Sequence, residues 1–178
     1  MEIQATEISG VFTVAIPSFK DERGLFQKLY RRDVFEAQGI DWQIREEFVS
    51  VSAKGVLRGM HFQKAPFAHH KLVSCYAGRV LDVVLDMRAG SETFGKTYSQ
   101  ELGDTITGLI LPEGVAHGFY ALEDSSIVHY QTSCEYVPEA DSGVHWDSFG
   151  FKWPCADPDL SGRDEKHPKW NPEETPFK

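Results

Sequence analysis

The stretch GVLRGMHFQ, residues 55–63, places Arg58 and His61 three positions apart in an otherwise apolar segment. Such a segment predicts burial, and a buried polar or charged group is costly unless something pairs with it. The two residues therefore need either a partner in the protein interior or a ligand.

A second spacing of this kind is P-x-G-x2-H, which ends at His117. Together with the first segment it resembles the two motifs of the cupin superfamily, small jelly-roll barrels whose inward side chains often hold a metal. Metal-binding cupins carry a second histidine where this chain has Gln63, and metal sites usually need three or four His, Asp, Glu or Cys ligands. We therefore expect no metal. The alternative is a site made by His61, His117 and one of His69 or His70.

The chain has 178 residues, of which 41% are hydrophobic and 25% charged. This length suits one domain with a sizeable core. We expect a single domain over residues 1–178, with a C-terminal tail that wraps the surface from about residue 154. No apolar run approaches the ~20 residues of a membrane span. The acidic start, MEIQATEISG, lacks the basic region and apolar core of a signal peptide. A cytoplasmic location without a membrane partner is the expectation.

The formal net charge of -9 predicts a surface that repels polyanions, so we expect no nucleic-acid partner. A small anionic ligand stays compatible with this charge if basic residues gather in one cleft. The three cysteines form no CxxC pair. Their odd number and wide spacing argue against a disulfide framework or a cysteine zinc site.

Short strand-like runs separated by glycine and proline dominate the chain and predict an antiparallel sandwich or barrel. The Ala77-Gly78 pair between two such runs predicts a hairpin turn. One short helix is expected, with Asp33 as its N-cap and Gly39 at its end. The expected strands are Val11–Ile16, Gly55–Gln63, Lys71–Tyr76, Arg79–Met87, Gly108–Leu111 and Ser126–Thr132.

The strand at Ser126–Thr132 places Tyr130 and His129 on opposite faces, because side chains alternate along a strand. If Tyr130 points inward, His129 points outward. A lone histidine is more often a hydrogen-bonded structural residue than a catalyst, and His129, His145 and His167 are interpreted in that way.

A longer series of motifs resembles one family of cupins. The motifs, in order, are DERGLF at 21–26, GVLRGMHFQ at 55–63, KLV at 71–73, GRVLDVVLDMRAGSETFG at 78–95, ILPEGVAHGF at 110–119, Tyr130, Tyr136-x-Pro138, Trp153-Pro154 and LSGRD at 160–164. This series looks like the dTDP-4-dehydrorhamnose 3,5-epimerase family, the sugar-nucleotide epimerases of deoxyhexose biosynthesis. The likeness covers the chain from about Phe12 to Asp164.

The resemblance implies a mainly β, antiparallel jelly-roll (cupin) barrel with a few short helices, and a homodimer. It implies an epimerase that needs no cofactor and inverts C3, C5 or both of an NDP-4-keto-6-deoxyhexose. The pathway would be deoxysugar biosynthesis for O-antigen or another cell-surface polysaccharide. The expected partner is then a nucleotide sugar in its dTDP, CDP or GDP form.

The resemblance also implies roles for individual residues. The family's general base matches His61, and the aspartate that orients this base matches Asp164. Tyr130 matches the acid on the opposite face of the sugar, and Lys71 the lysine beside the ketone. These types suit the chemistry, because an enolate needs a cation or donor at its oxygen and inversion needs a second proton donor. Residues expected to contact the substrate are Arg23, Phe26, Lys28, Glu46, Phe48, Arg58, Gln63, His117, Tyr136 and Asp141.

Four of these positions depart from the family pattern. Lys28 replaces a glutamate, Glu46 a glutamine, Phe48 an asparagine and Asp141 a glutamate. An ionised Glu46 only accepts hydrogen bonds, so a base with an exocyclic amine, such as cytosine or guanine, would suit it better than thymine. The alternative is that Glu46 and Lys28 pair with each other.

Residues three apart, such as Arg58 and His61, lie on opposite faces of a regular strand. A bulge at Gly59 would turn one of the side chains back into the cavity. Two further activities are alternatives. A 3,4-ketoisomerase would move a proton between adjacent carbons on one face, which makes Tyr130 less necessary. A metal-dependent or binding-only cupin is the other.

Overall fold

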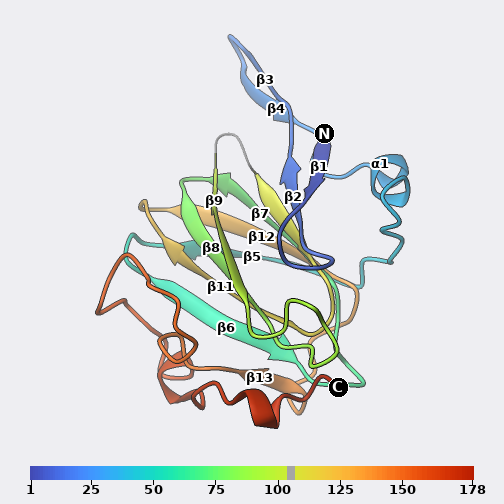
Figure 1. Cartoon of the computed structure of the whole chain (residues 1–178). Helices are drawn as coiled ribbons and strands as arrows, with labels where there is room; N and C mark the ends of the chain where they lie inside the picture. Colours follow the sequence, from blue (N-terminus) through green and yellow to red (C-terminus); the bar gives the residue numbers. More distant parts are fainter. Residues whose placement is uncertain (104–106) are drawn as a thin grey trace.

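A computed structural model describes residues 1–103 and 107–178. Two antiparallel sheets face each other, with strand orders β1-β2-β10-β7-β12-β5 and β13-β6-β11-β8-β9 (Figure 1). The prediction of a mainly β, antiparallel jelly-roll barrel is confirmed. The strands are β1 Glu2–Ala5, β2 Phe12–Ala15, β3 Ser18–Asp21, β4 Gly24–Gln27, β5 Glu46–Ser52, β6 Leu57–Gln63, β7 Lys71–Ala77, β8 Val80–Asp86, β9 Thr97–Leu102, β10 Gly108–Leu111, β11 Val115–Ala121, β12 Ser126–Thr132 and β13 Asp141–Gly143. The helices are α1 Arg32–Glu36, η1 Asp164–Lys166 and η2 Pro172–Glu174.

The main core lies between the two sheets and draws residues from both. Val73 of β7 and Val128 of β12 come from the six-stranded sheet, while Val84 of β8 and Phe119 of β11 come from the five-stranded sheet. Tyr130 belongs to the same cluster. Burial of inward-facing β-branched and aromatic residues thus holds the two layers together and leaves one end of the barrel for polar groups.

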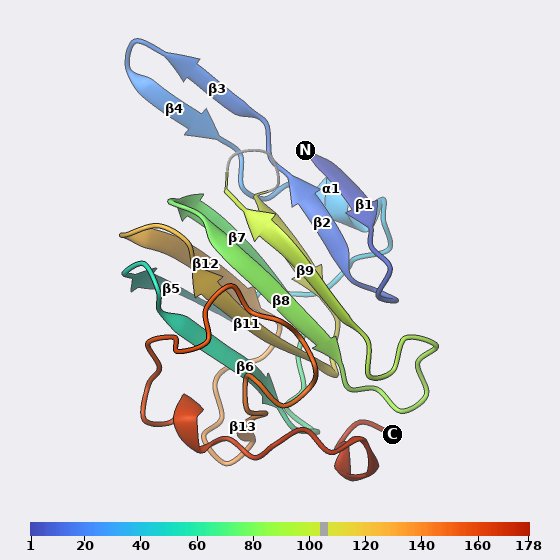
Figure 2. The same cartoon turned by 60° about the vertical axis from the view of Figure 1, so that its left-hand side comes forward.

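The outer face of the five-stranded sheet is covered by the C-terminal tail. Leu85 of β8 and Met60 of β6 pack there against aromatic residues of the tail, among them Phe149, Trp153 and Phe177. Figures 1 and 2 both show this segment running beside β6 and β13. The apolar alternation along β8 therefore serves two cores, one on each face.

The outer face of the six-stranded sheet is covered at one end and exposed at the other. Phe35 of α1 packs on Val14 of β2 and Ile110 of β10. Among residues 1–103 and 107–178, nothing covers edge strand β5 in this way, and its outward Val49 and Val51 are each 59% exposed. Apolar residues in this position leave an unpartnered surface beside the site.

The β3–β4 hairpin projects beyond the barrel, as both cartoon views show (Figures 1 and 2). Its apolar side chains are solvent-exposed, with Phe19 at 61%, Leu25 at 52% and Phe26 at 57%. A two-stranded arm with exposed aromatics has little to stabilise it within one chain.

Two local expectations are wrong. Ala77-Gly78 does not close a hairpin, because β7 pairs with β10 and β12 while β8 pairs with β9 and β11 in the opposite sheet. The chain changes layers there so that both strands can face the shared core. The helix begins at Arg32 after an N-cap at Arg31, so Asp33 lies in its first turn and not at the N-cap. In the described part of the chain, no helix is long and apolar enough to cross a membrane.

Candidate active site

An irregularity in β6 brings Arg58 and His61 to the same face. β11 pairs its His117 with His61 and its Phe119 with Arg58, so β6 holds one extra residue between the two pairs. Gly59 allows this with a φ of +143, and a Cβ there would lie 2.5 Å from the Gly118 Cα. The expected departure from regular pairing at Gly59 is present, and only glycines fit this close approach.

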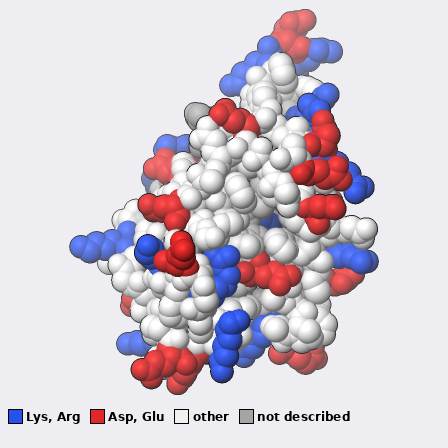
Figure 3. Space-filling view, turned by 45° about the vertical axis from the view of Figure 1, so that its right-hand side comes forward, with Lys and Arg blue, Asp and Glu red and all other residues white. Residues whose placement is uncertain are grey.

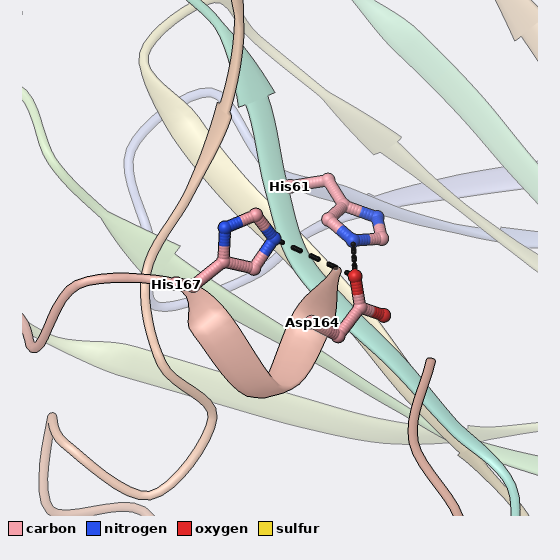
Figure 4. Close-up of side chains that lie close together, drawn as sticks. All are labelled: His61, Asp164 and His167. Atoms are coloured by element: carbon pink, nitrogen blue, oxygen red, sulfur yellow. Dashed lines mark hydrogen bonds and ion pairs between the residues drawn. The ribbon is translucent and has the colours of Figure 1, made fainter. Parts of the chain in front are cut away.

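His61 is held by Asp164, which comes from the start of η1 far along the chain. The His61 Nε2 lies 2.7 Å from Asp164 Oδ1 (Figure 4). The Gly59 amide donates to Asp164 Oδ2 at 3.2 Å. Asp164 is 3% exposed. The expected orienting contact is therefore present, and it leaves His61 Nδ1 as the ring nitrogen with no hydrogen bond in the described part of the chain.

The electrostatics of this pair favour a neutral imidazole beside an ionised carboxylate. Burial lowers the pKa of His61, and the hydrogen bond to Asp164 opposes this only in part. Burial alone would raise the pKa of Asp164, but the neighbouring His167 and the hydrogen bonds with His61 and the Gly59 amide outweigh it and lower that pKa. A neutral imidazole with one ring nitrogen fixed by a carboxylate is the form of a general base.

Tyr130 points into the barrel, while His129 points outward and bonds the Tyr76 hydroxyl at 2.7 Å from Nδ1. The Tyr130 ring meets that of His117 edge to face, with centroids 6.0 Å apart. Burial, with Asp82 nearby, raises the pKa of Tyr130 above its usual range. The phenol therefore keeps its proton at neutral pH and is a proton donor.

His117 forms a second histidine–aspartate pair inside the barrel. Its Nε2 lies 2.8 Å from Asp82 Oδ2, and both side chains are buried. Burial raises the pKa of Asp82, and the neighbouring His117 offsets this only in part. Because His117 and His61 are cross-strand partners, this pair lies directly beside the first one.

Lys71 places a cation beside His61. Its Nζ donates to the His61 backbone oxygen at 3.3 Å. Burial lowers the pKa of Lys71 to about 8, although Asp141 and Asp82 oppose the shift. An ammonium group with this pKa is still mostly protonated at neutral pH and is a suitable partner for a developing enolate oxygen.

A pocket of about 320 Å³ opens beside His61 and Lys71. Predicted residues that line it are His61, Lys71, Glu46, Phe48, Gln63, Tyr136 and Asp141. Tyr130 does not line it, but its ring stacks on that of Phe48, which does. Arg58 is also outside the lining, and its Nε donates to Ser52 Oγ at 3.0 Å.

Several lining residues are already engaged with the protein. The Gln63 amide donates to Phe67 and Glu135 backbone oxygens and accepts from the Val137 amide, so it ties loops rather than facing a ligand. Glu46 Oε2 accepts from the Tyr136 amide at 2.6 Å. At the rim, the Tyr136 hydroxyl donates to Asp141.

The protruding hairpin keeps three predicted residues away from this pocket. Arg23 pairs with Asp21 at the hairpin turn, and Phe26 is exposed. Lys28 lines a different hollow, together with Phe19. In the described residues no ion pair joins Lys28 to Glu46, so the expected alternative pairing is absent within one chain.

Sequence reasoning missed two neighbours of the site. Arg163 lines the pocket and pairs with Asp141 at 3.0 Å. Its place directly before Asp164 in the LSGRD motif was a usable signal. His167, interpreted as a structural residue, lies 3.5 Å from Asp164 Oδ1.

The donor cluster that could hold a metal shares only His61 with the set considered from the sequence. Over the described residues, the only cluster of three His, Cys, Asp or Glu donors is His61, Asp164 and His167, with donor atoms within 4.8 Å of one another. His117, His69 and His70 are not part of it. Two imidazoles and a carboxylate suit zinc, although the hydrogen bond inside the cluster already satisfies His61 Nε2.

Comparisons with known proteins decide the family. The model of the dTDP-4-dehydrorhamnose 3,5-epimerase family matches residues 5–172. The chain belongs to this family. Its assignment to the epimerases, which are isomerases, is thereby confirmed.

Named relatives within this epimerase family support the assignment over nearly the whole chain. The dTDP-4-dehydrorhamnose 3,5-epimerase of Shigella flexneri is 39% identical over 168 residues, covering 92% of this chain and 93% of the relative. A dTDP-4-dehydrorhamnose 3-epimerase of Streptomyces niveus is 37% identical over 169 residues, which cover 93% of this chain and 82% of the relative. The crystal structure of RmlC from Legionella pneumophila with dTDP-4-keto-L-rhamnose matches with a TM-score of 0.89 at 33% identity. The match covers 94% of this chain and 92% of the RmlC chain.

Proposed function

We propose that this protein inverts the configuration of a dTDP-linked 4-keto-6-deoxyhexose at C3, and at C5 as well when the reaction is complete. It needs no cofactor. The observation that carries the proposal is the His61–Asp164 pair at 2.7 Å, placed at a pocket that also holds Lys71. The names of the relatives, one a 3,5-epimerase and one a 3-epimerase, support the substrate class.

His61 is the base that removes the proton from the substrate. Asp164 binds Nε2, so the neutral Nδ1 accepts the proton from the carbon beside the ketone. The negative charge then moves onto the carbonyl oxygen, where the Lys71 ammonium stabilises it. Asp164 stabilises the imidazolium that forms, because its carboxylate remains ionised.

Inversion requires that the proton return to the opposite face of the enolate. Tyr130 is the donor in this scheme, because its phenol is protonated and it extends from β12, in the sheet opposite to β6. Phe48 covers it and must make way for the substrate. The charge of Arg58 acts on the phenol and opposes the rise in its pKa, and the His117 ring contacts it edge to face.

We further propose a homodimer in which the β3–β4 hairpin of one chain reaches the pocket of its partner. The exposed Phe19, Leu25 and Phe26 of the hairpin support this, as do the exposed Val49 and Val51 beside the pocket. Burial of such a surface is a strong driving force for association. A partner's Arg23 would bring a cation to a diphosphate, and its Lys28 would face Glu46.

The pocket volume supports a division of the ligand. About 320 Å³ is at the lower end for small-molecule sites, so it suits the sugar, and the nucleotide extends towards the rim at Glu46 and Tyr136. On the face drawn in Figure 3, acidic and basic side chains are interspersed. The diphosphate is thus expected to depend on local cations such as Arg163 rather than on a broad basic surface.

The test is to incubate the protein with dTDP-4-keto-6-deoxyglucose in deuterated water and follow C3 and C5 by NMR. Deuterium at one or both carbons with inverted configuration is the expected result. No exchange with the dTDP, CDP, GDP or UDP form would refute the proposal. His61→Asn should abolish exchange, a loss of ~10²–10⁴-fold. His145→Asn, a histidine paired with Asp147 outside the site, is the matched control.

Tyr130→Phe separates the two half-reactions. His61 can still remove a proton and return a deuteron from the same face, so exchange should persist while inversion is lost. A 3,4-ketoisomerase would instead form a 3-keto product, and its activity would be near normal in Tyr130→Phe.

A further inference from the structure

Asp164 has a second imidazole beside it. His167 Nε2 lies 3.5 Å from Oδ1, the same oxygen that binds His61. The two rings meet edge to face, with centroids 5.5 Å apart, and both point at the carboxylate (Figure 4). The His167 side chain is 10% exposed, and its Nε2 is buried without a hydrogen bond in the described part of the chain, so its contact with Asp164 is an ion-pair contact and not a hydrogen bond.

The location of the His167 ring is fixed by the surrounding backbone. His167 directly follows η1, the short helix that begins at Asp164, so both side chains belong to one rigid turn. The ring fills the space where residue 143 lacks a side chain, since a Cβ on Gly143 would lie 2.5 Å from His167 Nε2. Gly143 pairs with His61 across β13 and β6. The glycine therefore makes room for His167 beside the base.

We propose that His167 is a positioning residue that directs the Asp164 carboxylate towards His61 and shares its negative charge. This inference rests on the proposed function, because it assigns His167 a part in the same site. Because two imidazoles contact the same oxygen, the orientation of the Asp164 carboxylate is restricted. This keeps His61 in the tautomer with a free Nδ1. His167 is not among the described residues that line the pocket, and it reaches the base through Asp164 and through its ring contact with His61.

The charges around Asp164 set the direction of the expected effect. His61 approaches from β6, and the Arg163 Nε lies 3.9 Å from Oδ1. The Gly59 amide binds Oδ2, and Lys71 acts on His61 from β7. If His167 is removed, the carboxylate charge is divided among fewer donors. His61 then experiences a stronger anion, so its pKa should rise.

The test compares His167→Leu, which has no donor, with His167→Gln, which retains an N–H at similar reach. We expect kcat to fall about tenfold in His167→Leu with KM little changed, the scale for losing a group that orients the partner of a functional histidine. The acid limb of the profile of kcat/KM against pH should move to higher pH. His167→Gln should recover most of kcat.

Two results would overturn the inference. One is a His167→Leu enzyme with unchanged kcat and an unchanged acid limb. The other is equal loss in His167→Leu and His167→Gln with unchanged acid limbs, which marks a packing role.

An NMR titration of the His61 ring nitrogens in the unliganded protein needs no turnover. It should show a higher His61 pKa in His167→Leu than in wild type. It keeps this inference separate from the proposed function: absent turnover in wild type refutes the function, whereas an unchanged His61 pKa refutes the role of His167.

Discussion

Tyr130 stacks almost parallel on Phe48, with ring centroids 4.6 Å apart and 15° between the planes. Phe48 is 45% exposed and covers Tyr130, which is 8% exposed. A double-mutant cycle with Phe48→Leu and Tyr130→Leu, measured by urea unfolding, should give a coupling free energy of about 0.5–1.5 kcal/mol. A coupling of zero would mean that the stack does not form in solution.

The dependence of kcat/KM on pH should be bell-shaped. Activity falls as pH drops through the pKa of His61, which burial holds below its usual 6.5, because the base must be neutral. It falls again as pH rises through the pKa of Lys71, about 8, because the ammonium must be charged. Lys71→Arg should move only the alkaline limb, to higher pH. An alkaline limb unmoved by this change would exclude Lys71 as its origin.

Lys71 should reduce the stability of the free protein. Its folded pKa, about 8, lies below the unfolded 10.5, so the unfolded chain binds more protons between these values and stability rises with pH across that window. Lys71→Met should therefore raise the free energy of unfolding at pH 7, by roughly 3 kcal/mol. The gain should shrink between pH 8 and 10.5, as urea unfolding at several pH values would show. A gain that is constant with pH would point to packing instead.

Mixing two inactive variants tests the crossed hairpin. A site in the proposed dimer uses His61 from one chain and Arg23 and Phe26 from the other. His61→Asn mixed with Arg23→Ala/Phe26→Ala should recover about a quarter of wild-type activity, because half of a random mixture is heterodimers with one intact site each. Equal recovery is not expected from His61→Asn mixed with Lys71→Met. No recovery after confirmed subunit exchange would show that the hairpin serves its own chain.

Added zinc should inhibit. His61, Asp164 and His167 present three donors within 4.8 Å, and a bound ion would occupy the base. Inhibition by micromolar Zn²⁺ should be reversed by a chelator and be weaker in His167→Leu. The enzyme stripped with chelator should keep full activity. Loss of activity on stripping, restored by a metal, would contradict the proposed chemistry.

The extent of prediction from sequence differs between core and edge. Gly108–Leu111 and Ser126–Thr132 coincide with β10 and β12, because buried strands carry their apolar pattern in the sequence. Edge strand β5 was not expected, since its valines face outward and its inner face carries serines. The prediction of a hairpin at Gly78 was wrong, because the residues of a turn do not determine in which sheet the next strand lies.

The site divides in a similar way. The contact between His61 and Asp164 was expected from motif resemblance, and no local pattern could have joined residues so far apart. His167 gave no signal, because its significance depends on the empty side-chain position at Gly143. Arg23, Phe26 and Lys28 lie outside the pocket of their own chain, which a sequence cannot distinguish from lining it.

Gly59 and Gly118 touch through their backbones, and a Cβ on either would collide with the other strand. The direction of the His61 ring thus depends on two glycines, because neither position has room for a side chain. A mutagenesis library aimed at new keto-sugars should leave both untouched and concentrate its diversity at Glu46, Phe48 and Tyr136. The barrel should therefore accept substitutions at the rim of the pocket, but hardly any at the contact between β6 and β11 beside His61.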